Sequence, residues 1–141
     1  MNLSEESVYY FAYASNLSKK QMRERALESK SMFVATLPNY RLAFAGWSRQ
    51  WRGGSATIVL SRGDKVLGAI YEVSEKDLRR LDSFEDCPRS YGRISVTVFD
   101  EDGNAVEAVT YIRAGRLEET QPSKEYLAGI QQGYRDWELF K

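Results

Sequence analysis

The chain has 141 residues, of which 43% are hydrophobic and 28% charged, as is typical of one globular domain with a single core. Its 20 basic and 20 acidic residues cancel, so no overall charge draws it to nucleic acid. Histidine is absent and Cys87 is the only cysteine, which excludes a Ser-His-Asp triad, a Cys-His pair, a histidine-bearing zinc site and an internal disulfide. Any general base must therefore be a carboxylate, a lysine, a tyrosine or that thiol.

The sequence also lacks the signals of a membrane or secreted protein. No apolar run approaches the roughly 20 residues that a membrane-spanning helix needs. The first six residues, Met1–Glu6, are acidic and polar, unlike a secretory signal. We therefore expect residues 1–141 to form a single cytoplasmic domain that binds neither membrane nor nucleic acid.

The most informative local pattern begins at Tyr10. Tyr10–Tyr13 is apolar and aromatic and predicts a strand, residues 14–16 are small or polar, and Lys19–Arg25 has the composition of a helix. A loop that opens a helix directs free backbone N–H groups outward at the positive end of the helix dipole, where carboxylates and other small anions bind. The alternative is an ordinary strand–helix connection without a ligand.

Between residues 31 and 73, the alternation of apolar and polar residues predicts four strands separated by turn signals. The first should end at Pro38, and a loop rich in Arg, Trp and Gly follows the second. The last two are expected to pair as a hairpin around the turn Ser61-Arg62-Gly63-Asp64. The four predicted strands are residues 31–37, 40–47, 55–60 and 66–73.

A helix should then begin at Ser74, with Asp77 completing an approximate capping box, and end before Pro88. Two further strands joined by a hairpin turn, and one or two amphipathic helices, follow at residues 91–99, 105–113 and 122–140. The predicted fold class is α+β: six to seven strands in a mixed, mostly antiparallel and curved sheet, or in a small β-barrel, with three to four helices.

Glu85 is the candidate for an acid–base group. At about 100° per residue, Leu78, Leu81 and Glu85 fall in one narrow sector of the predicted helix. A carboxylate on the face that two leucines bury is partly desolvated, which raises its pKa and lets it shuttle protons near neutral pH. The alternatives are that Glu85 extends into solvent or pairs with Arg89 or Arg93. The neighbouring aspartates at positions 82 and 86 are expected to be structural.

Four segments in the right order resemble the γ-glutamylcyclotransferase family. The family signature Y-F-A-Y-G-S-N-L is similar to Tyr10–Leu17, and W-x-G-G-x-A-T-I is similar to Trp51–Ile58. The pattern L-D-x-x-E, which ends in the family's catalytic glutamate, matches Leu81–Glu85, and P-S-x-x-Y resembles Pro122–Tyr126. Each segment alone is a weak signal, but four in register are specific.

The resemblance implies a γ-glutamylcyclotransferase-like fold and a metal-free reaction without a cofactor. In that reaction, the α-amine of a γ-glutamyl amide attacks its own γ-carbonyl, which releases pyroglutamate (5-oxoproline) and a free amine or amino acid. Glu85 would be the general acid and base. The substrate-binding residues that the resemblance implies are Tyr10, Phe11, Ala12, Tyr13, Ala14, Ser15, Asn16, Tyr126 and Tyr91. Similar proteins are often monomers or homodimers.

Some of these residues also have a purely structural interpretation. For Tyr91 and Tyr126, the alternative to substrate binding is an aromatic side chain in the core whose hydroxyl is satisfied by the protein. This alternative is the expectation for Tyr91. Gly53 and Gly54 are expected to serve turn geometry. Two positions depart from the family pattern: Ala14 and Asp86 stand where glycine is usual, and a left-handed backbone would be costly at Ala14.

Two other functions remain open from the sequence. One is a non-catalytic domain that binds γ-glutamyl compounds or other carboxylates. The other is stacking of nucleic-acid bases on the cluster Trp47, Arg49, Trp51 and Arg52, for which the alternative is a solvated loop with its tryptophans packed inward. The sequence does not identify the departing amine, so glutathione breakdown, γ-glutamyl-lysine salvage and removal of a γ-glutamyl protecting group are all compatible with it.

Overall fold

Five strands form one closed sheet in the computed structural model, which describes residues 7–115 and 118–139: β1 (Ser7–Ala12), β2 (Lys30–Ser48), β3 (Gly53–Ser74), β4 (Tyr91–Phe99) and β5 (Ala105–Arg113). Neighbours in the barrel follow the order β1-β3-β2-β4-β5, and β1 closes it against β5. The contact between β1 and β5 is parallel and the other pairings are antiparallel. The predicted α+β class with a mixed small barrel is confirmed, with five strands instead of six or seven.

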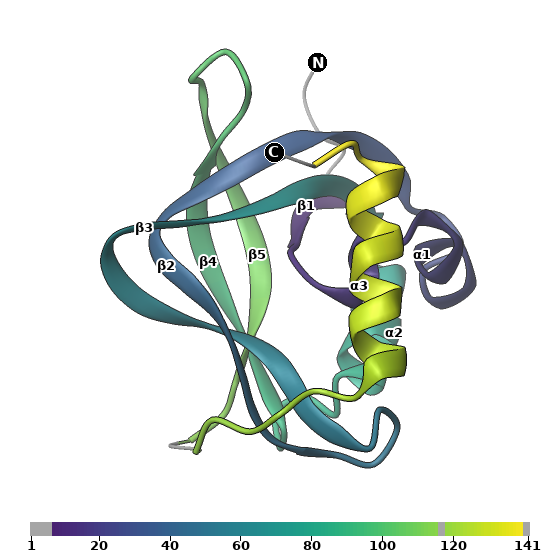
Figure 1. The fold of residues 1–141 in the computed structure, drawn as a ribbon. Helices are drawn as coiled ribbons and strands as arrows, with labels where there is room; N and C mark the ends of the chain where they lie inside the picture. The colour runs from purple at the N-terminus through teal and green to yellow at the C-terminus, as the bar shows by residue number, and fades with distance from the viewer. Residues whose placement is uncertain (1–6, 116–117, 140–141) are drawn as a thin grey trace.

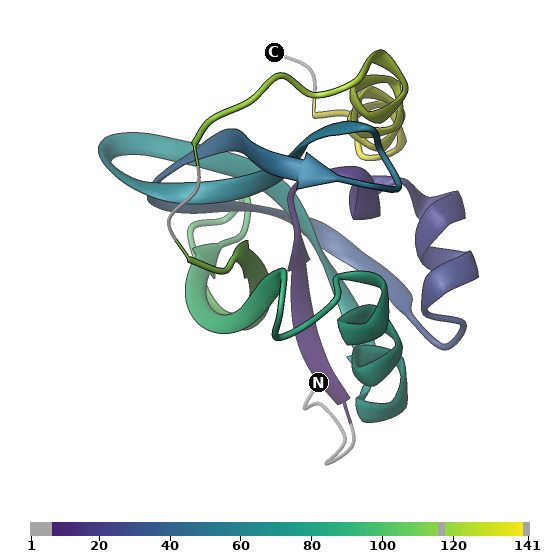
Figure 2. The same ribbon diagram turned by 90° about the horizontal axis from the view of Figure 1, so that it is seen from below.

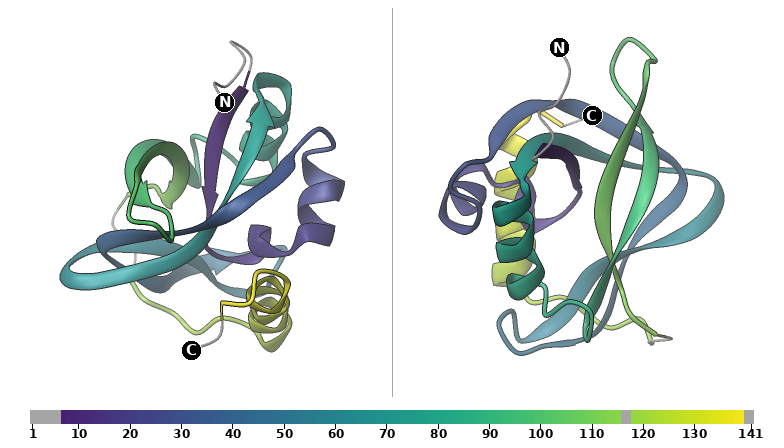
Figure 3. Two further views of the ribbon diagram at one scale, coloured as in Figure 1. Left: turned by 90° about the horizontal axis from the view of Figure 1, so that it is seen from above. Right: turned by 180° about the vertical axis from the view of Figure 1, so that it is seen from behind.

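The helices gather on one side of the barrel (Figures 1 and 3). They are a 3-10 turn, η1 (Ser15–Leu17), and three α-helices, α1 (Lys19–Arg25), α2 (Glu75–Phe84) and α3 (Lys124–Asp136). Each α-helix begins after a serine whose hydroxyl accepts a hydrogen bond from an amide of the first turn: Ser18, Ser74 and Ser123. No helix within residues 7–115 and 118–139 is long and apolar enough to cross a membrane.

Strand β2 is longer than predicted because Pro38 does not end it. The strand continues through Pro38, and the next residue, Asn39, adopts a left-handed backbone with φ of 65°. Asn39 marks a bulge, since the pairing with β3 shifts between Pro38 and Tyr40. Bulges bend a strand and increase its twist, so one here lets a 19-residue strand curve around the barrel.

The hairpin predicted around residues 61–64 is wrong. Residues 55–60 and 66–73 belong to the same strand, β3, and both pair with β2. Residues 61–64 of β3 lie opposite Asn39 of β2 at the bulge. There the amide of Gly63 donates a hydrogen bond to Oδ1 of Asn39 at 3.1 Å. The turn signal there was real, because Gly63 has φ of 87°, but it produces a bend within a strand pair instead of a reversal.

Strand β1 is buried on both faces. Phe11 and the following Tyr13 contribute to the core inside the barrel, whereas Tyr10 and Ala12 belong to a second core between the barrel and the helices α1 and α2. Figure 2 shows β1 between these helices and the β4–β5 hairpin. Such double burial explains why this segment is a continuous apolar run instead of an alternating one. The chain therefore leaves β1 at the point where the two cores meet.

Gly53 and Gly54 permit a close backbone approach instead of the turn geometry expected of them. A Cβ at Gly54 would lie 2.7 Å from the carbonyl oxygen of Thr120, and one at Gly53 would lie 2.8 Å from the amide nitrogen of Ser123. The amide of Gly54 also donates to the carbonyl of Gln121 at 2.8 Å. These contacts fix the segment that leads into α3 against the start of β3.

We expect Gly54→Ala to destabilise the protein by about 1–3 kcal/mol, because the added methyl group forces backbone atoms apart. Urea unfolding monitored by tryptophan fluorescence measures this loss. The matched control is Gly92→Ala in β4, where nothing lies within 4 Å of the added Cβ. Equal stability of the two variants would contradict a role for Gly54 in this close approach.

Candidate active site

A cavity of about 300 Å³ opens where β1 ends. Its walls come from segments far apart in the sequence. They include the loop 13–16, the end of α1, the loop between β2 and β3, the start of β3, the end of α2, the start of β4, the end of β5 and the first turn of α3. Among the residues predicted to form the site, it is lined by Tyr10, Tyr13, Ala14, Ser15, Asn16, Glu85, Tyr91 and Tyr126. Phe11 and Ala12 do not line it, because their side chains fill the two cores on either face of β1.

Glu85 follows the last residue of α2, and its amide donates to the carbonyl of Leu81 at 2.9 Å. Its side chain is 17% exposed, and Oε2 lies 3.4 Å from Nδ2 of Asn16 and 3.9 Å from a guanidinium nitrogen of Arg25. Burial raises the pKa of Glu85 to about 7, although Arg25, Asn16 and Arg113 each act to lower it. A carboxyl group with this pKa exchanges protons readily at neutral pH.

Glu85 neither extends into solvent nor pairs with Arg89 or Arg93, the two alternatives to a buried carboxylate. Arg89 pairs with Asp86 at 4.0 Å, and Arg93 pairs with Asp82 at 3.1 Å, so the neighbouring aspartates take the arginines considered for Glu85. Asp86 has φ of 52°, a left-handed conformation that aspartate tolerates better than most residues.

Asn16 links the loop to the carboxylate. Its Nδ2 donates to the hydroxyl of Tyr10 at 2.9 Å as well as to Glu85. Its Oδ1 accepts from Nε2 of Gln21 at 2.9 Å and from Arg25 at 3.3 Å. Bonds on both ends of the amide fix its orientation, so the donor group stays directed at Glu85.

The free backbone amides lie in the expected loop but not at the start of α1. The start of α1 is already occupied, since Oδ2 of Asp136 accepts from the amide of Lys19 at 2.9 Å and Ser18 caps Gln21. Free amides lie instead one turn earlier: in the described part of the chain, the backbone nitrogens of Ser15 and Asn16 donate no hydrogen bond. Ala14 has φ of −135°, so the left-handed strain expected at this position does not arise.

Tyr91 and Tyr126 both form hydrogen bonds with the backbone of Ala56 in β3. The hydroxyl of Tyr91 donates to the carbonyl of Ala56 at 2.5 Å, and the hydroxyl of Tyr126 accepts from the amide of Ala56 at 2.9 Å. The hydroxyl of Tyr91 is thus satisfied by the backbone, although the side chain also lines the cavity, and burial raises the pKa of Tyr91 to about 12. Tyr126 uses its oxygen as an acceptor, which leaves its hydroxyl proton available to a ligand. Trp51 stacks on Tyr126 with ring centroids 4.7 Å apart, whereas Trp47 is 65% exposed.

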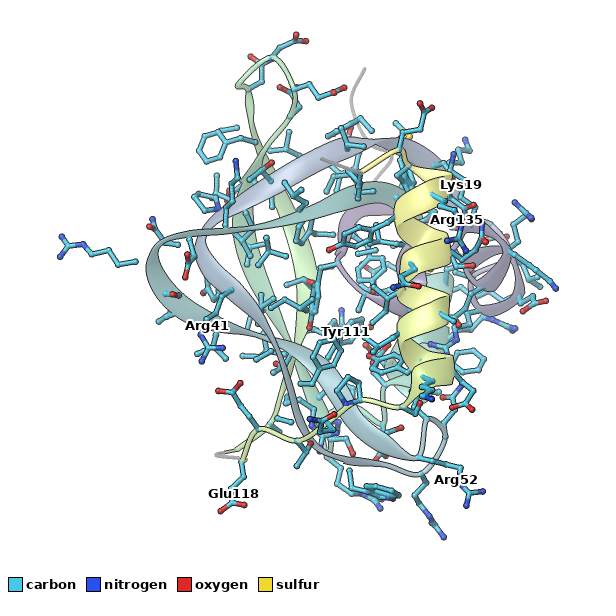
Figure 4. The ribbon with its side chains drawn as sticks, in the orientation of Figure 1. Lys19, Arg41, Arg52, Tyr111, Glu118 and Arg135 are labelled. Carbon is cyan, nitrogen blue, oxygen red and sulfur yellow. The ribbon has the colours of Figure 1, made fainter. Side chains whose placement is uncertain are left out.

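Among the cavity-lining residues that sequence reasoning missed are Arg25, Ser55, Tyr111 and Arg113. Tyr111 lies in the interior of the molecule (Figure 4), and its hydroxyl donates to Oδ1 of Asp82 at 2.5 Å. Arg25 is 6% exposed, which is unusual for an arginine. Tyr111 and Arg25 belong to none of the four family-like segments. The pairing of β5 brings Tyr111 to the cavity, and the packing of α1 brings Arg25 there. Within residues 7–115 and 118–139, no three Asp, Glu or Cys side chains come together as a metal site.

Comparisons with known proteins identify a family for the chain. The family model described as "Gamma-glutamyl cyclotransferase, AIG2-like" matches residues 10–138. The chain is 32% identical over 137 residues to a Homo sapiens gamma-glutamylcyclotransferase, a match that covers 94% of this chain and 72% of the human protein. A Mus musculus gamma-glutamylaminecyclotransferase is 44% identical over a shorter stretch of 52 residues, which covers 34% of this chain and 35% of that protein.

Solved structures show the same fold. A structure titled "Gamma-glutamyl cyclotransferase" superimposes with a TM-score of 0.90 at 31% identity, covering 95% of this chain and 82% of the other.

We expect Glu85→Gln to change how stability depends on pH. The pKa of Glu85 is about 7 in the folded protein against 4.5 for a free side chain, so the folded state holds a proton that the unfolded chain releases between these values. The free energy of unfolding of the unsubstituted protein should therefore fall by an amount on the order of 3 kcal/mol between pH 4 and 8, and the variant should lack this fall. Urea unfolding across this range measures both. Parallel curves for the two proteins would contradict a buried carboxylate.

Proposed function

The chain belongs to the gamma-glutamyl cyclotransferase, AIG2-like family, and we propose that it catalyses the intramolecular aminolysis of a γ-glutamyl amide, with Glu85 as general acid and base. The α-amine of the substrate attacks its own γ-carbonyl carbon, a bond forms between them, and the amide bond to the departing amine breaks. The products are pyroglutamate and a free amine or amino acid. The nucleophile arrives with the substrate, so this chemistry suits a protein without histidine.

In this proposal, Glu85 handles the protons. The substrate's α-ammonium group must lose a proton before it can attack, and the departing nitrogen must gain one before it can leave. Glu85 accepts the first proton and returns it to the second nitrogen, which leaves the carboxylate unchanged after each turnover. Because the pKa of Glu85 is about 7, neither transfer is strongly uphill at neutral pH.

The loop and the cavity supply the positioning. We propose that the free amides of Ser15 and Asn16 bind the α-carboxylate of the substrate, which places the α-amine beside Glu85. The Asn16 side chain supports this arrangement, since it contacts Glu85 at 3.4 Å from the same loop. The available hydroxyl proton of Tyr126 is a candidate donor to the substrate. Holding the amine and the carbonyl together supplies much of the rate, as in other intramolecular reactions.

One observation carries the proposal: a carboxylate with a raised pKa lies against the loop that presents unpaired amides, inside one cavity. A domain that only bound carboxylates would have no use for a proton acceptor at that place. The alanine at position 14, where the family has glycine, does not favour such a domain either, because the backbone of Ala14 is not left-handed.

We expect Glu85→Gln to lower pyroglutamate release from γ-glutamyl-alanine by two or more orders of magnitude, because it keeps the shape and removes the proton acceptor. Chromatographic measurement of pyroglutamate checks this. The matched control is Glu75→Gln, which neutralises an exposed carboxylate at the start of the same helix. Undiminished turnover by Glu85→Gln would rule out Glu85 as the base, and calorimetric binding of substrate without any product from the unsubstituted protein would indicate a binding domain.

The pH dependence of kcat/KM offers a second test. Since Glu85 must be deprotonated to accept a proton, kcat/KM should rise with pH and level off above about 7. Arg25 lowers the pKa of Glu85, so Arg25→Gln should move the inflection to higher pH. A profile that is flat between pH 5 and 8 would contradict a role for a carboxylate of this pKa.

A further inference from the structure

Two buried hydrogen-bond donors that line the cavity have no hydrogen-bond acceptor among the described residues. The hydroxyl of Ser55 and Nε of Arg113 are buried, and neither atom has the geometry of a hydrogen bond to any residue that the structure describes. Both side chains lie beside the hydroxyl of Tyr91, whose pKa they lower, but that hydroxyl already donates to the carbonyl of Ala56. Ser55 is only 3% exposed, and both residues line the cavity. Buried donors are nearly always satisfied, because leaving one unpaired costs about 1–3 kcal/mol. Their position in a cavity indicates that the partner is a ligand.

The fold holds the Arg113 side chain at the cavity wall. Arg113 is the last residue of β5, and its amide donates to Oγ1 of Thr57 at 2.9 Å, which ties the end of the strand to β3. The guanidinium lies over the ring of Tyr91, 5.3 Å from its centroid, and Tyr91 is the register partner of Arg113 across the β4–β5 pair. A guanidinium stacked in this way keeps its N–H groups directed along the plane of the group.

The charge of Arg113 is also uncompensated, unlike that of Arg25. Arg25 donates to the side chains of Asn16 and Gln50 and lies 3.9 Å from Glu85. Arg113 forms no ion pair within 4.0 Å of any carboxylate in the described ranges, although it is close enough to Glu85 to lower its pKa. A half-buried guanidinium without a counter-ion favours a carboxylate, which it binds through two parallel hydrogen bonds.

We propose that Arg113 and Ser55 bind a carboxylate carried by the departing amine, so that they select γ-glutamyl amino acids over γ-glutamyl amines. This inference rests on the proposed function. A γ-glutamyl amino acid has two carboxylates separated by several bonds on opposite sides of the amide that breaks. In this proposal, the free amides of Ser15 and Asn16 bind the α-carboxylate of the γ-glutamyl group. Arg113 and Ser55 bind the carboxylate of the departing amino acid. A simple γ-glutamyl amine would leave Arg113 and Ser55 unpaired.

Two substrates that differ only in the carboxylate test this assignment: γ-glutamyl-alanine and γ-glutamyl-ethylamide. The unsubstituted protein should prefer γ-glutamyl-alanine. The comparison is made on the high-pH plateau of kcat/KM, where losing the charge of Arg113 no longer changes the protonation state of Glu85. There, kcat/KM of Arg113→Met for γ-glutamyl-alanine should fall about 30–100-fold, mainly through KM, while the value for the ethylamide changes less than about threefold. Ser55→Ala should show a smaller loss, confined to γ-glutamyl-alanine. The matched control is Arg62→Met, which removes the same charge from the exposed bulge of β3.

The outcomes separate this proposal from the proposed function. Equal losses with both substrates would overturn it, because Arg113 would then act on the reacting carbonyl or on the fold. Calorimetric binding of both compounds to Glu85→Gln, alone and combined with Arg113→Met, gives a readout that does not need turnover. Weaker binding of γ-glutamyl-alanine alone in the double variant would support the subsite even if no pyroglutamate formed. Equal binding of the two compounds to Glu85→Gln would overturn it.

Discussion

The site depends on burying the carboxylate of Glu85 away from water while its polar neighbours only partly replace the lost hydration. The end of α2 brings it against the loop after β1, where Asn16 donates one long hydrogen bond and Arg25 lies 3.9 Å away. Full compensation by a close ion pair would hold the carboxylate ionised and depress its pKa, whereas no compensation would keep it protonated. The intermediate arrangement leaves a pKa of about 7, which is the property that proton transfer needs.

The barrel makes this arrangement possible because it buries β1 on both faces. With Phe11 in one core and Tyr10 in the other, the end of β1 cannot shift in either direction. The loop that follows is therefore fixed relative to α2, which packs on the second core through Leu78 and Leu81. The bulge at Asn39 bends β2 and β3 together, so that their connecting loop also reaches the cavity.

Some polar groups in the cavity have hydrogen-bond partners within the protein, and others have none among the described residues. Tyr91 and the side chains of Asn16 and Arg25 satisfy one another or the backbone, and they give the site its rigidity. The hydroxyl of Ser55 and Nε of Arg113 are unpaired among the described residues. In the proposed reaction, the rigid groups position the substrate, and the unpaired groups select the substrate that pairs with them. In the two proposals, chemistry and specificity therefore reside on different elements: Glu85 follows α2, whereas Ser55 lies in β3 and Arg113 in β5.

The sequence by itself determined the α+β class, the helix that begins after Ser74 and the place of Glu85 beside the leucines that α2 buries, because these follow from local periodicity and capping. It misassigned the turn at Gly63, since a glycine with a left-handed backbone serves a bulge as well as a hairpin. Only the tertiary structure placed Arg113 and Ser55 in the cavity and left them unpaired. Strand pairing between distant segments decides which side chains share a cavity, and no local pattern records it.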